Sequence, residues 1–164
     1  MSRLSPESYK PILSFRYKII FSVLDGIEVF GRTVSLPKIE NNPISIEYGN
    51  TYMMLKGKSR WEPVTITCYA FEKITHEKLW QYLNELHQKI EDGKDFYADQ
   101  YKSDLQIQIL SPSADKLIGT FTLIGAFIQS IDFGKLDYEL NEVVQPELTF
   151  VYDYAKYEPN YNQV

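Results

Sequence analysis

Residues 117–157 read LIGTFTLIGAFIQSIDFGKLDYELNEVVQPELTFVYDYAKY, and this stretch decides the fold. Two apolar runs rich in β-forming residues, Gly119–Ile131 and Leu148–Tyr154, flank a polar middle segment. One face of the second run carries large apolar and aromatic side chains: Leu148, Phe150, Tyr152 and Tyr154. A half-buried antiparallel strand requires this period of two. The stretch therefore predicts β structure, and nothing in it resembles a catalytic constellation.

The composition is that of a globular protein rich in strands. The 164 residues are 44% apolar and 24% charged, which is ordinary for a soluble domain. Aromatic residues reach 15%, with 13 tyrosines, and this favours strands and contact surfaces. The length predicts one domain over residues 1–164, with an extended arm at 1–13 and a loose polar tail at 158–164.

The sequence carries no sign of membrane insertion or secretion. No apolar run approaches the roughly 18 residues that span a bilayer, and the N-terminus lacks the apolar core of a signal peptide. We therefore expect synthesis in the cytoplasm and no membrane partner. Cys68 is the single cysteine, so an internal disulfide is excluded. Its expected role is a buried inert thiol, with a nucleophile or a ligand as the alternative.

A β-hairpin is predicted near the N-terminus. Apolar and aromatic residues alternate with others in its first strand: Phe15, Tyr17, Ile19 and Phe21. Asp25-Gly26 is a strong hairpin turn signal. Ile27–Leu36 is therefore expected to pair back on the first strand, until Pro37 removes a ladder donor and ends it.

The next segment predicts a turn, a short strand and a long loop. Asn41-Asn42-Pro43 is the expected turn and Ile44–Tyr48 the expected third strand. The loop, Gly49–Pro63, combines the apolar patch Tyr52–Leu55 with three basic residues: Lys56, Lys58 and Arg60. Adaptable patches that contain methionine suit partner surfaces, so we expect the loop to project and to cover a partner. The alternative is a hairpin whose Met and Leu side chains fold back onto the core.

A strand, a helix and another strand follow. Val64–Phe71 and Leu105–Ile109 both show the period of two. The helix is expected at about 76–92, with Thr75 as N-cap and Gly93 just past the end. Its apolar residues form one stripe: Leu79, Leu83, Leu86 and Ile90. The order of elements predicts a mainly β fold, an antiparallel β sandwich or barrel with one flanking α-helix.

A search for catalytic or metal-binding motifs gives a negative result. His76 and His87 would lie about 16 Å apart along the helix, too far for one metal ion. Cys68 has no CxxC partner, and no nucleotide-binding or hydrolase motif occurs. Acidic pairs such as Glu91-Asp92 are more often solvated than catalytic. We therefore expect no enzyme activity, no metal and no cofactor.

Charge is distributed unevenly along the chain. Residues 1–60 carry 9 Lys and Arg against 5 Asp and Glu, a balance of +4, and residues 61–164 carry 8 against 17, a balance of −9. The two sum to the net charge of −5, which argues against a dedicated nucleic-acid binder. Regions of opposite sign can form complementary faces in a self-assembling protein. Chance scatter of charges is the alternative.

Three groups of motifs, in order over residues 15–157, resemble the tail tube proteins of contractile-tailed bacteriophages, the T4-like family. The first strand pair ends in Val34-Ser35-Leu36-Pro37, and the strand at Trp61–Phe71 precedes a helix with Leu79-Trp80. The third group lies near the C-terminus and comprises Gly134–Tyr138, Asn141-Glu142, Leu148–Phe150 and Tyr152–Tyr154. The segment Asn50–Arg60 departs from the family pattern.

The resemblance implies two packed β-sheets with a flanking helix and a structural role in a virion. It implies hexameric rings, joined by the sheets of neighbouring copies, that stack into a tube. The implied partners are other copies of the chain, tail sheath and baseplate proteins, and phage DNA that passes through the lumen without specific binding. A tube initiator or terminator and the tube of a phage-derived or type VI injection device remain alternatives. A small-ligand-binding β-barrel is the alternative from another class.

The candidate contact residues lie in the loop. We expect contacts between subunits, chiefly between stacked rings, from eight residues: Tyr52, Met53, Met54, Leu55, Lys56, Lys58, Arg60 and Trp61. The reason is the apolar patch beside a basic cluster in a segment bounded by glycines.

Overall fold

The computed structural model describes residues 12–21, 31–70, 77–91, 101–113 and 116–160. The chain is mainly β, as predicted, with one helix among the described residues. The strands in chain order are β1 (Tyr17–Phe21), β2 (Gly31–Val34), β3 (Ile39–Tyr48), β4 (Thr51–Trp61), β5 (Val64–Cys68), β6 (Ser103–Leu110), β7 (Leu117–Asp132), β8 (Glu147–Val151) and β9 (Tyr154–Pro159). The helix α2 (Glu77–Glu91) lies between β5 and β6.

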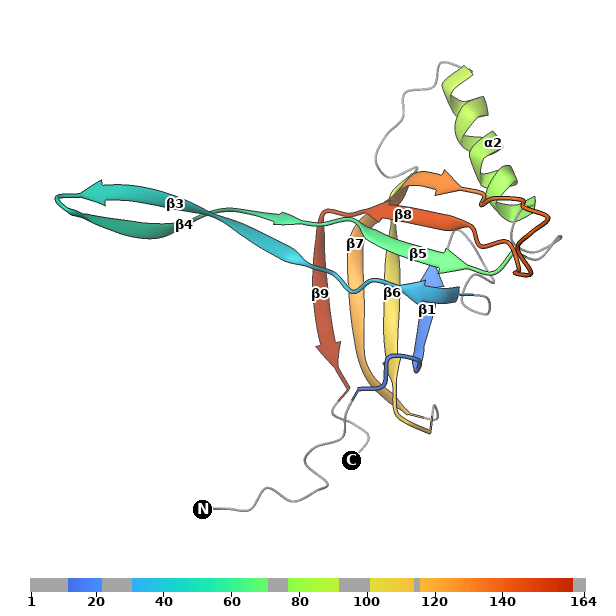
Figure 1. The fold of residues 1–164 in the computed structure, drawn as a ribbon, viewed down its shortest axis with the longest axis horizontal. Coiled ribbons are helices and arrows are strands. Elements are labelled where there is room, and N and C mark those ends of the chain that lie inside the picture. Colours follow the sequence, from blue (N-terminus) through green and yellow to red (C-terminus); the bar gives the residue numbers. More distant parts are fainter. Residues whose placement is uncertain (1–11, 22–30, 71–76, 92–100, 114–115, 161–164) are drawn as a thin grey trace.

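Two antiparallel sheets make up the described fold. The larger has seven strands in the order β1-β6-β7-β8-β5-β2, with β9 also paired to β7. The smaller consists of β3 and β4. In Figure 1, β1, β6 and β9 run across the direction of β2, β5 and β8, so the large sheet folds into two crossing layers. This packing is sandwich-like, which confirms the predicted fold class.

Strand β7 joins the two layers. Its first half pairs with β6 and β9, and its second half pairs with β8. Gly125 lies between the halves with a φ of 67°, a left-handed conformation that favours glycine. The carboxylate of Asp153 fills the space that a Cβ atom would occupy at Gly125, and Lys102 Nζ holds that carboxylate at 2.8 and 3.0 Å. A glycine and one ion pair therefore fix the bend.

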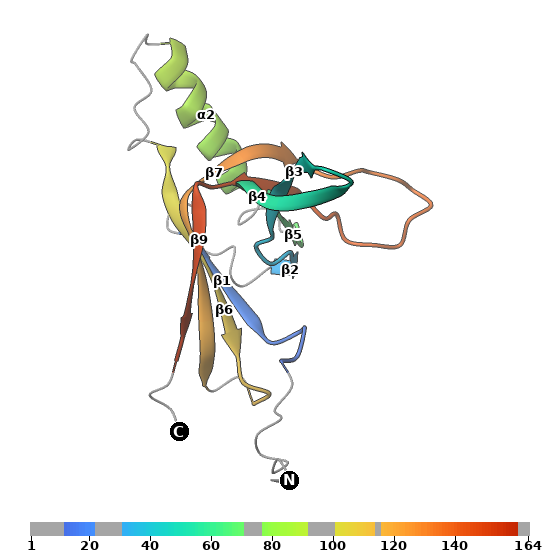
Figure 2. The same cartoon turned by 90° about the vertical axis from the view of Figure 1, so that its left-hand side faces the viewer.

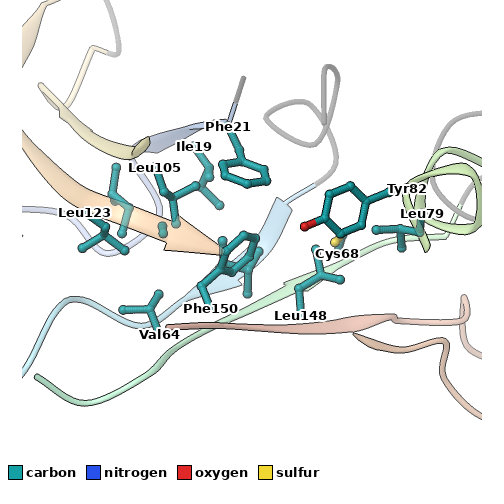
Figure 3. Packing of buried hydrophobic residues seen from close by; sticks show 13 residues of the cluster. Ile19, Phe21, Val64, Cys68, Leu79, Tyr82, Leu105, Leu123, Leu148 and Phe150 are labelled. Carbon is teal, nitrogen blue, oxygen red and sulfur yellow. The ribbon is translucent and has the colours of Figure 1, made fainter. Parts of the chain in front are cut away.

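The core lies between the two layers and is built from alternating positions of the strands (Figure 3). In β5, burial alternates in the predicted way, with Val64, Ile66 and Cys68 fully buried. The rings of Phe21 and Phe150 meet edge to face, with centroids 5.1 Å apart, a favoured aromatic geometry. Burial of each such side chain contributes about 1.5–3 kcal/mol to stability.

Helix α2 covers one end of the core, as the apolar stripe predicts. Leu79 and Tyr82 are buried and Leu83 is half-buried. Trp80 is exposed, and its ring lies 6.0 Å from that of Phe133. The predicted cap and stop, His76 and the side chains of Leu86, His87 and Ile90 lie outside the described residues.

The predicted N-terminal hairpin is wrong in its pairing. Strand β1 pairs with β6, and β2 pairs with β5, so the two lie at opposite ends of the sheet order. The pairing follows the core, because Ile19 and Phe21 stand opposite Ile107 and Leu105 on the buried face. The predicted turn at 25–26 lies outside the described residues.

The predicted turn at 41–43 and the predicted loop at 49–63 are also corrected. Strand β3 runs through Asn41-Asn42-Pro43 and absorbs the proline at a bulge opposite β4. Gly57 permits the bulge, because a Cβ atom there would collide with the carbonyl oxygen of Asn42. The loop is strand β4, joined to β3 by a tight turn in which Gly49 has a φ of 60°.

The C-terminal run divides into two strands. β8 ends at Val151 and β9 begins at Tyr154, because Asp153 turns the chain and its N–H donates to Ile124 O at 2.9 Å. The predicted tail at 158–164 starts too early. Residues 158 and 159 belong to β9, and Asn160 N donates to Ile118 O. Residues 161–164 lie outside the described part.

Candidate assembly surfaces

Strands β3 and β4 form a long hairpin that projects from the sandwich (Figures 1 and 2). Every residue of β3 is exposed, and in β4 exposure exceeds two fifths at Met53 (49%), Met54 (60%) and Leu55 (44%). The predicted projection is thus confirmed, and the Met and Leu side chains do not fold back onto the core. An isolated two-stranded hairpin is at best marginally stable in water, so this one favours a covering partner.

The register sorts the hairpin side chains into two faces. One face gathers exposed apolar residues from both strands, here called the apolar hairpin face: Ile44, Ile46, Tyr48, Met53 and Leu55. Ile44 stands opposite Leu55, and Ile46 opposite Met53. Tyr52, Met54 and Lys56 point to the other face, because side chains alternate along a strand. The predicted contact residues are therefore not one patch.

The base of the hairpin is braced against the sandwich. Lys38 Nζ bonds to Glu40 at 2.8 Å and to Glu62 at 3.2 Å, which raises the pKa of Lys38, and the same bond lowers the pKa of Glu40. The Trp61 ring lies 6.0 Å from that of Tyr152. Trp61 is half-buried, so it belongs to the base, whereas Lys58 and Arg60 are exposed.

A second exposed surface is the loop at residues 133–146, between β7 and β8, here called the acidic loop. It carries four exposed apolar side chains: Leu136, Tyr138, Leu140 and Val143. Its charges are one Lys and three acidic residues: Lys135, Asp137, Glu139 and Glu142. The loop encloses a cleft of about 250 Å³. We did not predict this surface from the sequence. The signal that could have indicated it is a set of apolar residues that alternate with acidic residues after Gly134.

The layer formed by β1, β6, β9 and the first half of β7, here called the first layer, has two free edges. Among the described residues, β1 pairs only with β6 and β9 only with β7. Figure 1 shows these edges on opposite sides of the layer. Beside β1 lies an apolar groove of about 380 Å³, lined in part by Ile12, Leu13 and Leu36. Free edges on a soluble protein invite pairing with another chain.

The described residues offer little for catalysis. No group of three or more His, Cys, Asp or Glu residues among them could hold a metal ion. Cys68 is fully buried, as predicted, and its burial raises the pKa of the thiol to about 11, so the thiol is neutral at physiological pH. No helix in the described part is long and apolar enough to cross a bilayer.

Solved structures of contractile injection systems share this fold. A chain in the sheath–tube complex of the extracellular contractile injection system PVC is 18% identical, with a TM-score of 0.73 over 96% of this chain and 100% of that one. A chain in the anti-feeding prophage cap, a tube terminating cap, is 16% identical, with a TM-score of 0.72 over 92% of each chain. A chain in the PVC sheath/tube terminator is 19% identical, with a TM-score of 0.68 over 90% of this chain and 96% of that one.

Sequence comparison adds nothing to this likeness. No known family matches the sequence, and no curated protein matches it. At identities below 20%, the structural likeness establishes the fold. The resemblance drawn from the sequence motifs is confirmed at that level: the fold is that of contractile tail tube proteins.

Proposed function

We propose, from the contractile tail tube fold, that this chain is a subunit of the inner tube of a contractile tail, built from stacked hexameric rings. One observation carries the proposal: the first layer has two free edges, β1 and β9, that face opposite ways. An interface between two different edges is heterologous, and such interfaces close into rings or extend as filaments. Pairing β9 of one copy with β1 of the next joins the layers of all subunits into one continuous barrel.

The register supports a barrel whose outer face is buried against the core and whose inner face is polar and solvated. Ile19, Ile107 and Phe121 stand in one cross-strand row that faces the core. The adjacent rows face away from the core and hold mostly polar residues: Lys18, Gln108, Thr120 and Glu158 in one, and Ile20, Gln106, Thr122 and Lys156 in the other. In the ring we propose, these rows line the lumen.

The charges of that face suit a channel. Lys18 and Lys156 contribute two positive charges, and Asp104 and Glu158 two negative ones, so the balance is zero. Tight binding of DNA depends on neutralising many phosphates with Lys and Arg. A lining without excess positive charge therefore lets phage DNA pass without being held.

The projecting hairpin supplies further contacts in this assembly. Its apolar face needs a cover, and the six copies of a ring provide identical surfaces for it. Tail sheath and baseplate proteins are the expected partners outside the tube, which places the protein in the tail particle. The tube of a phage-derived or type VI injection device fits the same features.

A terminator or initiator at the end of the tube is the second candidate. The TM-score to the chain in the tube terminating cap, 0.72, nearly equals the 0.73 to the chain in the sheath–tube complex. A terminator closes a ring but does not stack indefinitely. The length of the assemblies therefore separates the two roles.

Negative-stain microscopy of the purified chain, with one edge variant, tests the proposal. Asn160 N donates to Ile118 O, so by alternation the N–H of Ala155 points away from β7. Ala155→Pro keeps the internal ladder and removes one outward donor, as proline does on edge strands. We expect rings and tubes from the wild-type chain and from Ala155→Ser, and folded monomers from Ala155→Pro. Wild-type monomers at every concentration would refute the proposal.

A further inference from the structure

We propose that the apolar hairpin face of one copy docks on the acidic loop of a second copy, its neighbour in the ring. The inference rests on the proposed function and names the two surfaces that join. It differs from our expectation from sequence, which placed the loop contacts chiefly between stacked rings.

The placement of the two surfaces supports side-by-side docking. In Figure 1 the hairpin reaches past β9 on one side of the molecule, and the segment between β7 and β8 lies at the other end. A neighbour whose β1 meets this copy's β9 presents its opposite end to the hairpin. The hairpin and the edge β9 therefore contact the same neighbour, and the docking of the hairpin extends the interface formed by β9 and the neighbour's β1.

The apolar content of the two surfaces matches. Among described residues, exposed large apolar side chains gather on the hairpin and again on the acidic loop, where Leu136 is 86% exposed and Tyr138 fully exposed. Leu136, Leu140 and Val143 of the loop line one cleft, and exposed apolar groups gathered in this way mark interaction sites. Burial of each patch against the other removes both from water at every subunit of a closed ring.

The charges are complementary in sign. The acidic loop carries Lys135 against three acidic residues, a balance of −2. On the side of the apolar hairpin face, Arg60 stands opposite Glu40 and Lys58 lies at the bulge opposite Asn42, which gives two positive charges against one negative charge. Within the described residues Lys58 makes no ion pair, and Glu40 is held by Lys38 at 2.8 Å. Charges of opposite sign steer the two surfaces together and fix their register.

The cleft of the acidic loop fits a side chain better than a free ligand. Its volume of about 250 Å³ lies below the roughly 300–1,000 Å³ of small-molecule sites. Its wall is mixed: Leu136, Leu140 and Val143 line it together with Lys135, Asp137 and Glu142. A flexible thioether such as that of Met53 can fill an irregular space of this kind, against the apolar side chains that form part of its wall.

Disulfide trapping between two variants tests the docking. Met53→Cys protein, carrying a mass tag, is mixed with Leu136→Cys protein under assembly conditions and oxidised. Cys68 can remain, because its thiol is buried. We expect a mixed disulfide dimer on a non-reducing gel, and loss of that band when Glu85→Cys, an exposed position on α2, replaces Leu136→Cys.

Charge reversal gives a second readout. Lys58→Glu with Arg60→Glu should reduce the yield of trapped dimer, and Asp137→Lys with Glu142→Lys in the other copy should restore it. Restoration requires that the two surfaces meet, since loss of folding in one variant cannot be repaired by a change in the other.

Microscopy of the same mixtures separates this inference from the proposed function. Rings without the mixed disulfide would overturn the docking and leave the tube intact. A mixed disulfide without rings would support the docking and overturn the tube, and the absence of both would overturn both.

Discussion

The sandwich strands and the projecting hairpin show the same alternation of apolar and polar residues, but the apolar face is buried in the sandwich and exposed in the hairpin. Leu105 of β6 and Leu55 of β4 both stand on an apolar face of an antiparallel strand pair, yet Leu105 is 0% exposed and Leu55 is 44% exposed. The alternation that predicts a strand indicates that one side of the strand is apolar. It does not indicate whether residues of the same chain or of another copy bury that side. A strand pair whose apolar face stays open in the subunit therefore marks a surface to be covered by another copy.

Truncation of the hairpin should have the largest effect on assembly. Joining Pro43 to Lys56 through Asn-Gly removes the apolar hairpin face and keeps the braced base with Lys38 and Glu62. We expect a folded subunit that forms no tubes, because the sandwich core does not include the removed residues. Circular dichroism checks the fold, and microscopy checks the assembly. Normal tubes from this variant would show that the hairpin is dispensable.

A matched pair of variants sharpens the same point within the hairpin. Met53 lies on the apolar hairpin face, and Met54 lies on the other face. Met53→Asp should block tube formation, because it places a charge in the interface that we propose, whereas Met54→Asp should be tolerated. Equal loss with both variants would mean that both faces are covered.

The two leucines should differ in stability cost. Leu105→Ala should lower the free energy of unfolding by about 2–5 kcal/mol, as deletion of buried methyl groups does. Leu55→Ala should change the stability of the dispersed subunit by less than about 0.5 kcal/mol, since exposed positions tolerate substitution. Urea titration of both variants at a concentration below that of assembly measures the difference. A large cost at Leu55 would show that the subunit itself uses this face.

Two glycines with left-handed backbone offer a smaller contrast. Gly125→Ala should cost about 1–3 kcal/mol from backbone strain, plus displacement of the Asp153 carboxylate that occupies the space of the new Cβ. Gly49→Ala at the hairpin tip meets nothing within 4 Å, so it should cost only about 1–2 kcal/mol for the left-handed conformation. Thermal unfolding compares the two. If Gly49→Ala lowers stability as much as Gly125→Ala or more, the packing of Asp153 against Gly125 does not fix the bend in β7.

Salt should have the smallest effect, and only on assembly. Raising chloride from 0.1 to 1 M shortens the Debye length from about 10 to about 3 Å, and each exposed ion pair is worth about 0–1 kcal/mol. The critical concentration for tubes should rise while the unfolding of the subunit stays unchanged. Light scattering follows the first and circular dichroism the second. Indifference to chloride would leave apolar and strand-edge contacts as the whole driving force.

Elements with a strong local pattern could be predicted from the sequence. Alternation at Val64, Ile66 and Cys68 predicts β5. The spacing of Leu79 and Leu83 predicts the helix, because each pattern reports burial of one side of the element. Pairing between distant strands could not be predicted in this way. The partner of β1 is β6, some ninety residues away, and it is chosen by the shared core and not by the nearest turn signal.

The candidate surfaces were predicted only in part. The composition around Met53 and Lys56 correctly indicated a projecting segment, but not its division into two faces, since the bulge opposite Asn42 decides the register. Trp61, one of the predicted contact residues, is half-buried at the base of the hairpin, where its ring lies beside that of Tyr152. The acidic loop was read as polar, because Leu136 and Tyr138 stand singly among charges.

Hydrogen–deuterium exchange of the hairpin amides, in dispersed subunits and in the assembled state, tests the central claim most directly. We predict that the amides of residues 44–55 exchange fast in the dispersed chain and become protected on assembly, while β5 and β6 are protected in both states. Hairpin amides that exchange equally fast in tubes and in dispersed subunits would contradict the claim that a second copy covers this surface.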